Sequence, residues 1–137
     1  MSREIVEKDI ARIRTVLKKV PCHNDPLCQN WIQSDDVLYL IDWEYAGMND
    51  GFWDLAAVSI EAGYTEQMDE SLLKNYLNGR CADQTERKRF LAAKLFVDYL
   101  WTLWAKTRVP FDGQPMEDWA QERYKRLKEN MVQYQAL

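Results

Sequence analysis

The spacing of apolar residues changes near Phe52, and this change restricts the chain to a mainly helical fold. From there onward apolar residues recur at helical intervals, and the spacing predicts helices at about 52–63, 67–78, 84–108 and 115–134. The breaks fall at residues that favour loops, namely Gly63, Gly79 and the Pro110–Pro115 stretch. Asp83, followed three residues later by Glu86, resembles a capping box at the start of the longest helix.

Before Phe52 the predicted elements are a helix and two short strands, and polar loops separate them. Residues 3–20 carry apolar side chains on one face, which predicts an amphipathic helix that Pro21 ends. Two short strands are predicted at 31–33 and 37–41, and an acidic turn joins them into a hairpin. We therefore expect a mainly α fold with a small β-hairpin, in a single domain over residues 1–137.

Charge and hydropathy exclude several classes of protein. The chain has 18 Lys and Arg against 22 Asp and Glu, a net charge of -4, and its basic residues are scattered, so no nucleic-acid partner is expected. Its apolar runs are too short to cross a bilayer, and its N-terminus is not that of a signal peptide. Three irregularly spaced cysteines form no disulfide framework. We expect a cytoplasmic protein with no membrane insertion.

Polar residues flank the predicted hairpin on both sides. Asp25 and Asn30 lie in the loop before it, and Asp42 directly follows its second strand. Because a hairpin brings its two ends together, Asp42 should lie close to Asn30. A carboxylate and an amide oxygen are hard ligands that suit Mg²⁺, and Asp25 lies upstream where it can accept a proton from a hydroxyl nucleophile. These are the components of a phosphoryl-transfer site.

Two segments of this region resemble the catalytic and metal-binding loops of the choline kinase and aminoglycoside phosphotransferase family: His23-Asn24-Asp25-(four residues)-Asn30 and Ile41-Asp42-Trp43-Glu44-Tyr45. Residues 40–50, followed by Trp53-Asp54-Leu55-Ala56, resemble in particular the bacterial choline kinases of the lipopolysaccharide phosphorylcholine type. The resemblance runs from about residue 10 to about residue 130. It implies the C-terminal lobe of the protein-kinase-like fold.

The resemblance also implies an activity and its residues. Similar proteins transfer the γ-phosphate of ATP, their co-substrate, with Mg²⁺ to the hydroxyl of choline or a similar small amino-alcohol. The family's catalytic base corresponds to Asp25, and its metal ligands correspond to Asn30 and Asp42. His23 corresponds to the residue that supports the catalytic loop from within. Thiamine, ethanolamine and aminoglycosides are acceptors in similar proteins, and the Asp-Trp-Glu-Tyr loop does not separate choline from thiamine.

Aromatic residues point to the acceptor. A quaternary ammonium has no N–H to donate, so aromatic faces and a diffuse negative charge must hold it. Trp101 and Trp104 lie three residues apart, hence on one face of the long helix. By resemblance this pair and Trp119 in the last helix correspond to the family's choline pocket, and Glu61 corresponds to the acidic partner of the ammonium. Tyr45 adds an aromatic ring from the metal-binding loop. The tryptophan pair favours choline.

The family's nucleotide lobe has no counterpart here. The five glycines form no Gly-x-Gly-x-x-Gly, and no strand lysine precedes Asp25. The expectation is a C-terminal lobe without the N-terminal nucleotide lobe, weakly active or inactive alone. Two alternatives stay open: a non-catalytic remnant or binding module that keeps the aromatic pocket, and a helical module that self-associates as a homodimer through the surface that the other lobe normally covers.

Each assignment has a plainer interpretation. The Asp and Asn residues of the loops are common in turns, and a helix-spaced tryptophan pair is usually core. Trp31 and Trp53 are assigned to packing. Cys22, His23 and Cys28 match no common zinc spacing, so a zinc site is not favoured.

Overall fold

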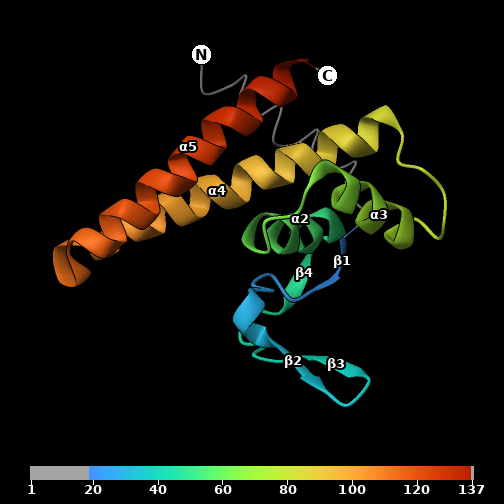
Figure 1. Ribbon diagram of the computed structural model, residues 1–137, viewed down its shortest axis with the longest axis horizontal. Helices are drawn as coiled ribbons and strands as arrows, with labels where there is room; N and C mark the ends of the chain where they lie inside the picture. Colours follow the sequence, from blue (N-terminus) through green and yellow to red (C-terminus); the bar gives the residue numbers. More distant parts are fainter. Residues whose placement is uncertain (1–18, 137) are drawn as a thin grey trace.

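Helices make up most of the computed structural model, which describes residues 19–136. The elements follow the order β1 (Lys19–Cys22), η1 (Cys28–Asn30), β2 (Trp31–Ser34), β3 (Val37–Leu40), β4 (Gly47–Asp50), α2 (Gly51–Glu61), α3 (Glu66–Tyr76), α4 (Gln84–Asp112) and α5 (Gln114–Ala136). Figure 1 shows α4 and α5 side by side, with α2 and α3 beneath them and the β2–β3 hairpin projecting away. The fold is mainly helical, as predicted. None of the helices described is long and apolar enough to span a membrane.

Polar side chains set the helix starts, and a glycine sets the end of α4. Asp50 accepts a hydrogen bond from Phe52 N at the start of α2 (3.1 Å), and the predicted capping box of Asp83 and Glu86 is present at the start of α4. The prediction that α4 ends near residue 108 is wrong. Helix α4 continues through Pro110 and ends at Gly113, whose φ is 72°.

The strands form two separate antiparallel pairs. The predicted hairpin is present, with a register from Trp31 opposite Leu40 to Ser34 opposite Val37. The second pair, β1 with β4, was not predicted, because four-residue strands far apart in the chain carry no apolar alternation. Of the helix predicted at 3–20, the last two residues are strand instead, and the rest lies outside the described residues. Pro21 is tolerated in β1 because, among the described residues, this strand pairs on one edge only.

Helix α2 is the centre of the packing and positions the loops around it. One buried cluster joins Phe52 and Ala56 of α2 to Leu73 and Phe90 of the neighbouring helices. A second cluster joins Ala57 and Ile60 to Val97, with Trp53 and Trp101 packed against it. Helix α2 therefore fixes the distance between the loop that follows β1 and the middle of α4. This is the space in which the candidate site lies.

Candidate active site

The first turn of α2 anchors the loop that carries Asp25. The two carboxylate oxygens of Asp54 accept the backbone N–H groups of His23 (2.7 Å) and Asn24 (2.8 Å). The indole N–H of Trp53 donates to the carbonyl of Asn24 (3.0 Å). Trp53, assigned to packing in the sequence analysis, therefore also fixes the loop by a hydrogen bond. The start of the helix at Asp50 is the sequence signal that places Trp53 and Asp54 in this turn.

Asn24 connects the anchored loop to two other segments. Its φ of 69° is left-handed, a conformation that asparagine tolerates better than most residues. Its side-chain amide donates to the carbonyl of Tyr45 (2.8 Å) and accepts from Nδ2 of Asn49 (2.9 Å). One residue thus holds the loop, the segment after the hairpin and strand β4 in a fixed arrangement.

His23 lies inside the loop, almost fully buried at 1% exposure. Its Nε2–H donates to the carbonyl of Ile41 (2.8 Å), while Nδ1 accepts the backbone N–H of Asp25 (3.3 Å). These two partners assign the neutral Nε2–H tautomer. The ring also packs edge-on against Trp43, with centroids 4.8 Å apart. His23 contacts both segments of the site, which suits the loop-supporting role predicted for it.

Asp25 has a buried carboxylate oxygen that no group in the described part of the chain satisfies. This atom, Oδ1, makes no hydrogen bond there. Burial raises the pKa of the Asp25 carboxyl above its ordinary value, and the carboxylates of Asp42 and Glu44 add to this effect. A carboxyl of raised pKa with one oxygen unpartnered among the described residues is the arrangement expected of a proton acceptor.

Asp25 is expected to make the fold less stable as the pH rises towards neutrality. The carboxyl has a higher pKa in the folded chain than in the unfolded one, so the unfolded chain loses its proton first. The free energy of unfolding therefore falls between the ordinary aspartate pKa, about 4, and the raised value. Asp25→Asn removes this penalty. In buffer containing EDTA, its melting temperature by circular dichroism should exceed that of the wild type near neutral pH, and the difference should shrink towards acid pH. Equal midpoints at neutral pH would contradict the prediction.

Asn30 and Asp42 lie at the base of the hairpin, where the backbone carbonyl of Asn30 accepts the N–H of Ile41 (2.9 Å). Nδ2 of Asn30 donates to the carbonyl of Asp25 (3.0 Å), which leaves its Oδ1 for a cation. The Asp42 carboxylate is exposed and has no partner among the described residues. The residues described contain no group of three or more His, Cys, Asp or Glu that could hold a metal. An amide oxygen with one carboxylate nevertheless fits Mg²⁺ that takes its other ligands from phosphate and water.

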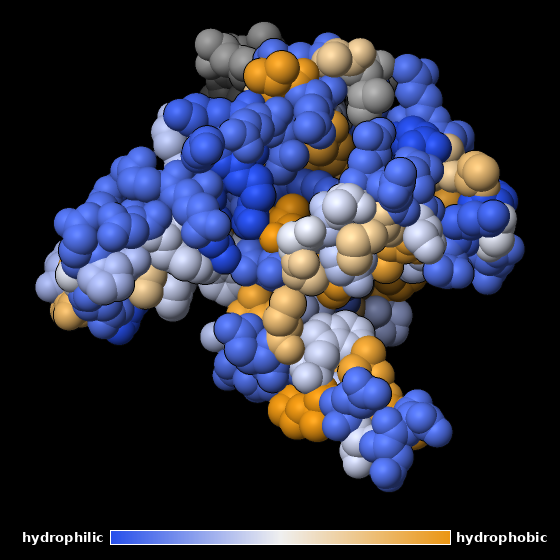
Figure 2. Space-filling model, viewed as in Figure 1, coloured by the Kyte–Doolittle hydropathy of each residue, from blue (hydrophilic) through white to orange (hydrophobic). Residues whose placement is uncertain are grey.

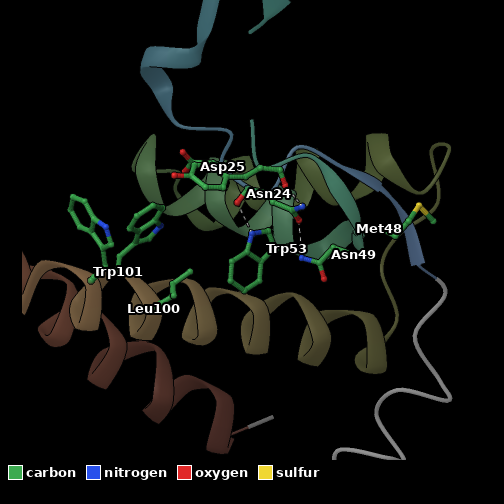
Figure 3. A pocket seen from close by; sticks show the side chains of 9 residues that line it. Asn24, Asp25, Met48, Asn49, Trp53, Leu100 and Trp101 are labelled. Carbon is green, nitrogen blue, oxygen red and sulfur yellow. Dashed lines mark hydrogen bonds between the residues drawn. The ribbon is translucent and has the colours of Figure 1, made fainter. Parts of the chain in front are cut away.

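A pocket of about 450 Å³ opens beside Asp25. It is lined by residues of the loops and of α4, namely Asn24, Asp25, Tyr45, Met48, Asn49, Trp53, Leu100, Trp101 and Trp104. Figure 3 shows Asn24 and Asp25 on the loop side, with Leu100 and Trp101 projecting from α4 on the other. Three of the predicted acceptor-binding residues, Tyr45, Trp101 and Trp104, thus share one pocket with the predicted base. Sequence reasoning missed the contributions of Met48, Asn49 and Leu100, which carry no distinguishing pattern.

Two predicted acceptor-binding residues do not line this pocket. Trp119 of α5 lies behind it, with its ring centroid 6.3 Å from that of Trp101 and 6.1 Å from that of Trp104. Glu61 is 10% exposed at its side chain, and both its carboxylate oxygens bind arginines, Oε2 to Arg123 (2.6 Å) and Oε1 to Arg126 (3.2 Å). Trp101 and Trp104 therefore line the pocket, whereas Trp119 and Glu61 do not.

Asp54→Asn is expected to destabilise the fold by about 2 kcal/mol, because an amide accepts the two loop N–H groups less well than a carboxylate and turns its own N–H towards one of them. Urea unfolding followed by circular dichroism measures the change. Asp118→Asn is the control, since Asp118 is exposed and binds only Gln114 one turn away among the described residues. Equal stability of the two variants would show that Asp54 does not anchor the loop.

Comparison with known proteins finds relatives that match most of this chain. A family model described as choline/ethanolamine kinase matches residues 5–130. The LicA protein of Haemophilus influenzae is 34% identical over 108 residues, which cover 75% of this chain. Among solved structures, the choline kinase LicA from Streptococcus pneumoniae has a TM-score of 0.73 at 32% identity and covers 94% of this chain. A structure of LicA in complex with AMP has a TM-score of 0.75 at 33% identity and also covers 94%.

The match extends over only part of these relatives. The chain spans 40% of the Haemophilus protein and 44% and 45% of the two LicA structures.

Proposed function

Because this chain belongs to the choline/ethanolamine kinase family, we propose that it carries the catalytic loop and acceptor pocket of a kinase that transfers the γ-phosphate of ATP to the hydroxyl of choline or a similar small amino-alcohol. The observation that carries this proposal is the shared pocket, which is lined by Asp25, with a carboxylate oxygen that has no partner among the described residues, and by Trp101 and Trp104. One side can accept a proton from a hydroxyl, and the other can hold a cation.

We assign acceptor binding, proton acceptance and support of the loop to different residues. The rings of Tyr45, Trp101 and Trp104 hold the ammonium of the acceptor by cation–π attraction. This leaves the hydroxyl end of a small amino-alcohol directed at Asp25, which accepts its proton as the oxygen attacks the phosphoryl group. His23 and Asp54 keep the loop in place through the backbone of residues 23–25 and do not touch the acceptor.

Asn30 and Asp42 are the residues that would hold Mg²⁺. When bound, this ion neutralises charge on the phosphate groups. The side-chain amide of Asn30, the proposed metal ligand, donates to the backbone carbonyl of Asp25, the proposed base. This hydrogen bond holds the two residues next to each other. A nucleotide-bound structure of a LicA relative supports ATP as the donor.

Choline is preferred to ethanolamine or an aminoglycoside as the acceptor. A primary ammonium needs hydrogen-bond acceptors, whereas much of this pocket's wall is indole ring, and the Asn24 side chain is already bonded to Tyr45 and Asn49. A methylated ammonium needs no such acceptors. The naming of one solved relative as a choline kinase agrees with this preference.

The proposal is tested by incubating the purified chain with ATP and Mg²⁺ and each acceptor in turn, and following products by ³¹P NMR. We expect phosphocholine, formed slowly, because the sequence contains no Gly-x-Gly-x-x-Gly loop to cover the phosphates. Faster phosphorylation of ethanolamine or thiamine would contradict the choice of acceptor. Absence of any product would favour the non-catalytic alternative, in which the pocket binds choline without turnover.

We further propose that the chain self-associates through the hairpin and the segment after it. Large apolar side chains are exposed there, between 42% and 59%: Ile32, Val37, Leu38, Tyr39, Ile41, Trp43 and Met48. Figure 2 shows hydrophobic residues among hydrophilic ones on this projecting part. Sedimentation should detect a concentration-dependent dimer that Leu38→Glu disrupts, because a charge in an apolar contact is costly. Met68→Glu, on exposed α3 away from the hairpin, is the control. A monomer at all concentrations would contradict this proposal.

A further inference from the structure

Arg123 of α5 occupies a position that the mechanism above does not use. Its side chain is 8% exposed, its guanidinium carbon lies 3.6 Å from the centre of the Trp119 ring, and Nη2 donates to Oε2 of Glu61 (2.6 Å). Its nearest exposed acid, Glu122, is farther away at 3.6 Å and 71% exposed. Arg123 is therefore a buried cation held between an indole face and a carboxylate.

Arg123 therefore supplies the cation that contacts both the Trp119 ring and the Glu61 carboxylate. A cation over an indole and beside an acid is the same chemistry that a quaternary ammonium would use. The other oxygen of Glu61 binds Arg126, so both oxygens are already paired with arginines. Arg126 also binds both oxygens of the fully buried Asp98. An incoming ammonium would have to displace a buried, charge-assisted contact to reach Glu61, at considerable cost.

Trp119 is connected to the pocket through the other two tryptophans. Its ring lies edge-on to both Trp101 and Trp104, which lie edge-on to each other with centroids 5.7 Å apart. Trp104 is 45% exposed, so little besides its neighbours restrains it on the pocket side. The guanidinium on Trp119 is thus the fixed end of a series of contacts that leads to the pocket wall.

From these contacts we infer that Arg123 is a positioning residue for the acceptor pocket: it anchors Trp119 from behind with Glu61 as its counter-ion, and so holds Trp101 and Trp104 in place for a cationic acceptor. Glu61 then acts through Arg123 and does not pair with the ammonium. The inference rests on the proposed function, because it assumes that the pocket takes a quaternary ammonium alcohol.

The direction in which Arg123→Met changes choline affinity separates this role from a direct contact of Glu61 with the ammonium. If Glu61 were the counter-ion of the ammonium, Arg123→Met would free the acid and tighten choline binding. If Arg123 is the positioning residue, Arg123→Met and Glu61→Gln both weaken binding. We expect about a tenfold loss for each, the size of a partly buried cation–π contact.

The experiment combines calorimetric titration of the chain with choline and the near-ultraviolet circular dichroism of its tryptophans without ligand. Glu122→Gln removes an exposed charge beside the same guanidinium and should change neither readout. Arg123→Lys keeps a cation for Glu61 but has no planar face for Trp119, so it should retain the fold and lose part of the tryptophan signal. It replaces Arg123→Met if that variant fails to fold.

The outcomes are distinguishable. Weaker choline binding together with an altered tryptophan signal in the Arg123 variants supports the inference. Unchanged or tighter binding in a folded Arg123 variant overturns it and leaves the proposed function intact. If the wild type binds no choline, the proposed function fails, and the tryptophan signal alone decides whether Arg123 holds the cluster: an unchanged signal overturns that as well.

Discussion

Asp25→Asn is expected to lower the rate of phosphoryl transfer to choline by at least about a hundredfold, while choline affinity stays within about twofold. An amide has the shape of the carboxyl but cannot take the proton of the acceptor hydroxyl. The substitution leaves the loop unchanged, because Asn30 and Leu27 bind the backbone carbonyl of Asp25 and its N–H binds His23. The effect should therefore appear in turnover and not in binding.

Initial rates of phosphocholine formation at saturating ATP and choline measure this effect, with calorimetry for affinity. Asp36→Asn, in the exposed turn of the hairpin, is the matched control and should leave both quantities unchanged. Wild-type turnover in Asp25→Asn would show that another group accepts the proton. A parallel loss of choline affinity would instead assign Asp25 to acceptor binding.

Trp101→Ala is expected to weaken choline binding by about 3 kcal/mol, which is more than a hundredfold. Trp101 lines the pocket, packs against the cluster of Ala57, Ile60 and Val97, and touches the rings of Trp104 and Trp119. Its removal takes away one cation-binding face and frees the other rings that this face restrains.

Calorimetric titration with choline checks the result. Trp101→Phe keeps an aromatic ring on the core and should lose much less affinity, which separates loss of the cation site from loss of packing. Tyr124→Ala removes an aromatic side chain of α5 that does not line the pocket, and it should bind choline like the wild type. Wild-type affinity in Trp101→Ala would mean that choline binds elsewhere.

Local signals in the sequence predicted most of the fold. Helical spacing predicted α2 to α5, and Asp83 with Glu86 predicted the start of α4, because both depend on residues close together in the chain. The β1–β4 pair was missed, since it joins residues such as Lys19 and Asp50 whose pairing depends on the packing of everything between them. The end of α4 was misplaced because Pro110 was treated as a stop, although α4 continues through it.

Part of the candidate site could likewise be predicted from local sequence, and the rest depends on tertiary packing. The hairpin brings the loop of Asp25 and Asn30 next to the segment of Asp42, and this follows from two short strands and a turn. The anchoring of the loop by Asp54 could not be read from spacing, because it uses backbone N–H groups thirty-one and thirty residues away. The contact of Arg123 with Glu61 spans 62 residues and depends on how α4 packs against both α5 and α2. Long-range side-chain pairs of this kind follow from tertiary packing, not from local periodicity.

Comparing choline with its neutral isostere 3,3-dimethylbutan-1-ol by calorimetric titration of the wild-type chain tests the central claim most directly. The two molecules share shape and hydroxyl and differ in the positive charge, so the difference isolates the cation-binding wall of Tyr45, Trp101 and Trp104. We predict that choline binds at least about tenfold more tightly. Equal affinity for the two, or no binding of choline, would contradict the assignment of this pocket to a quaternary ammonium acceptor.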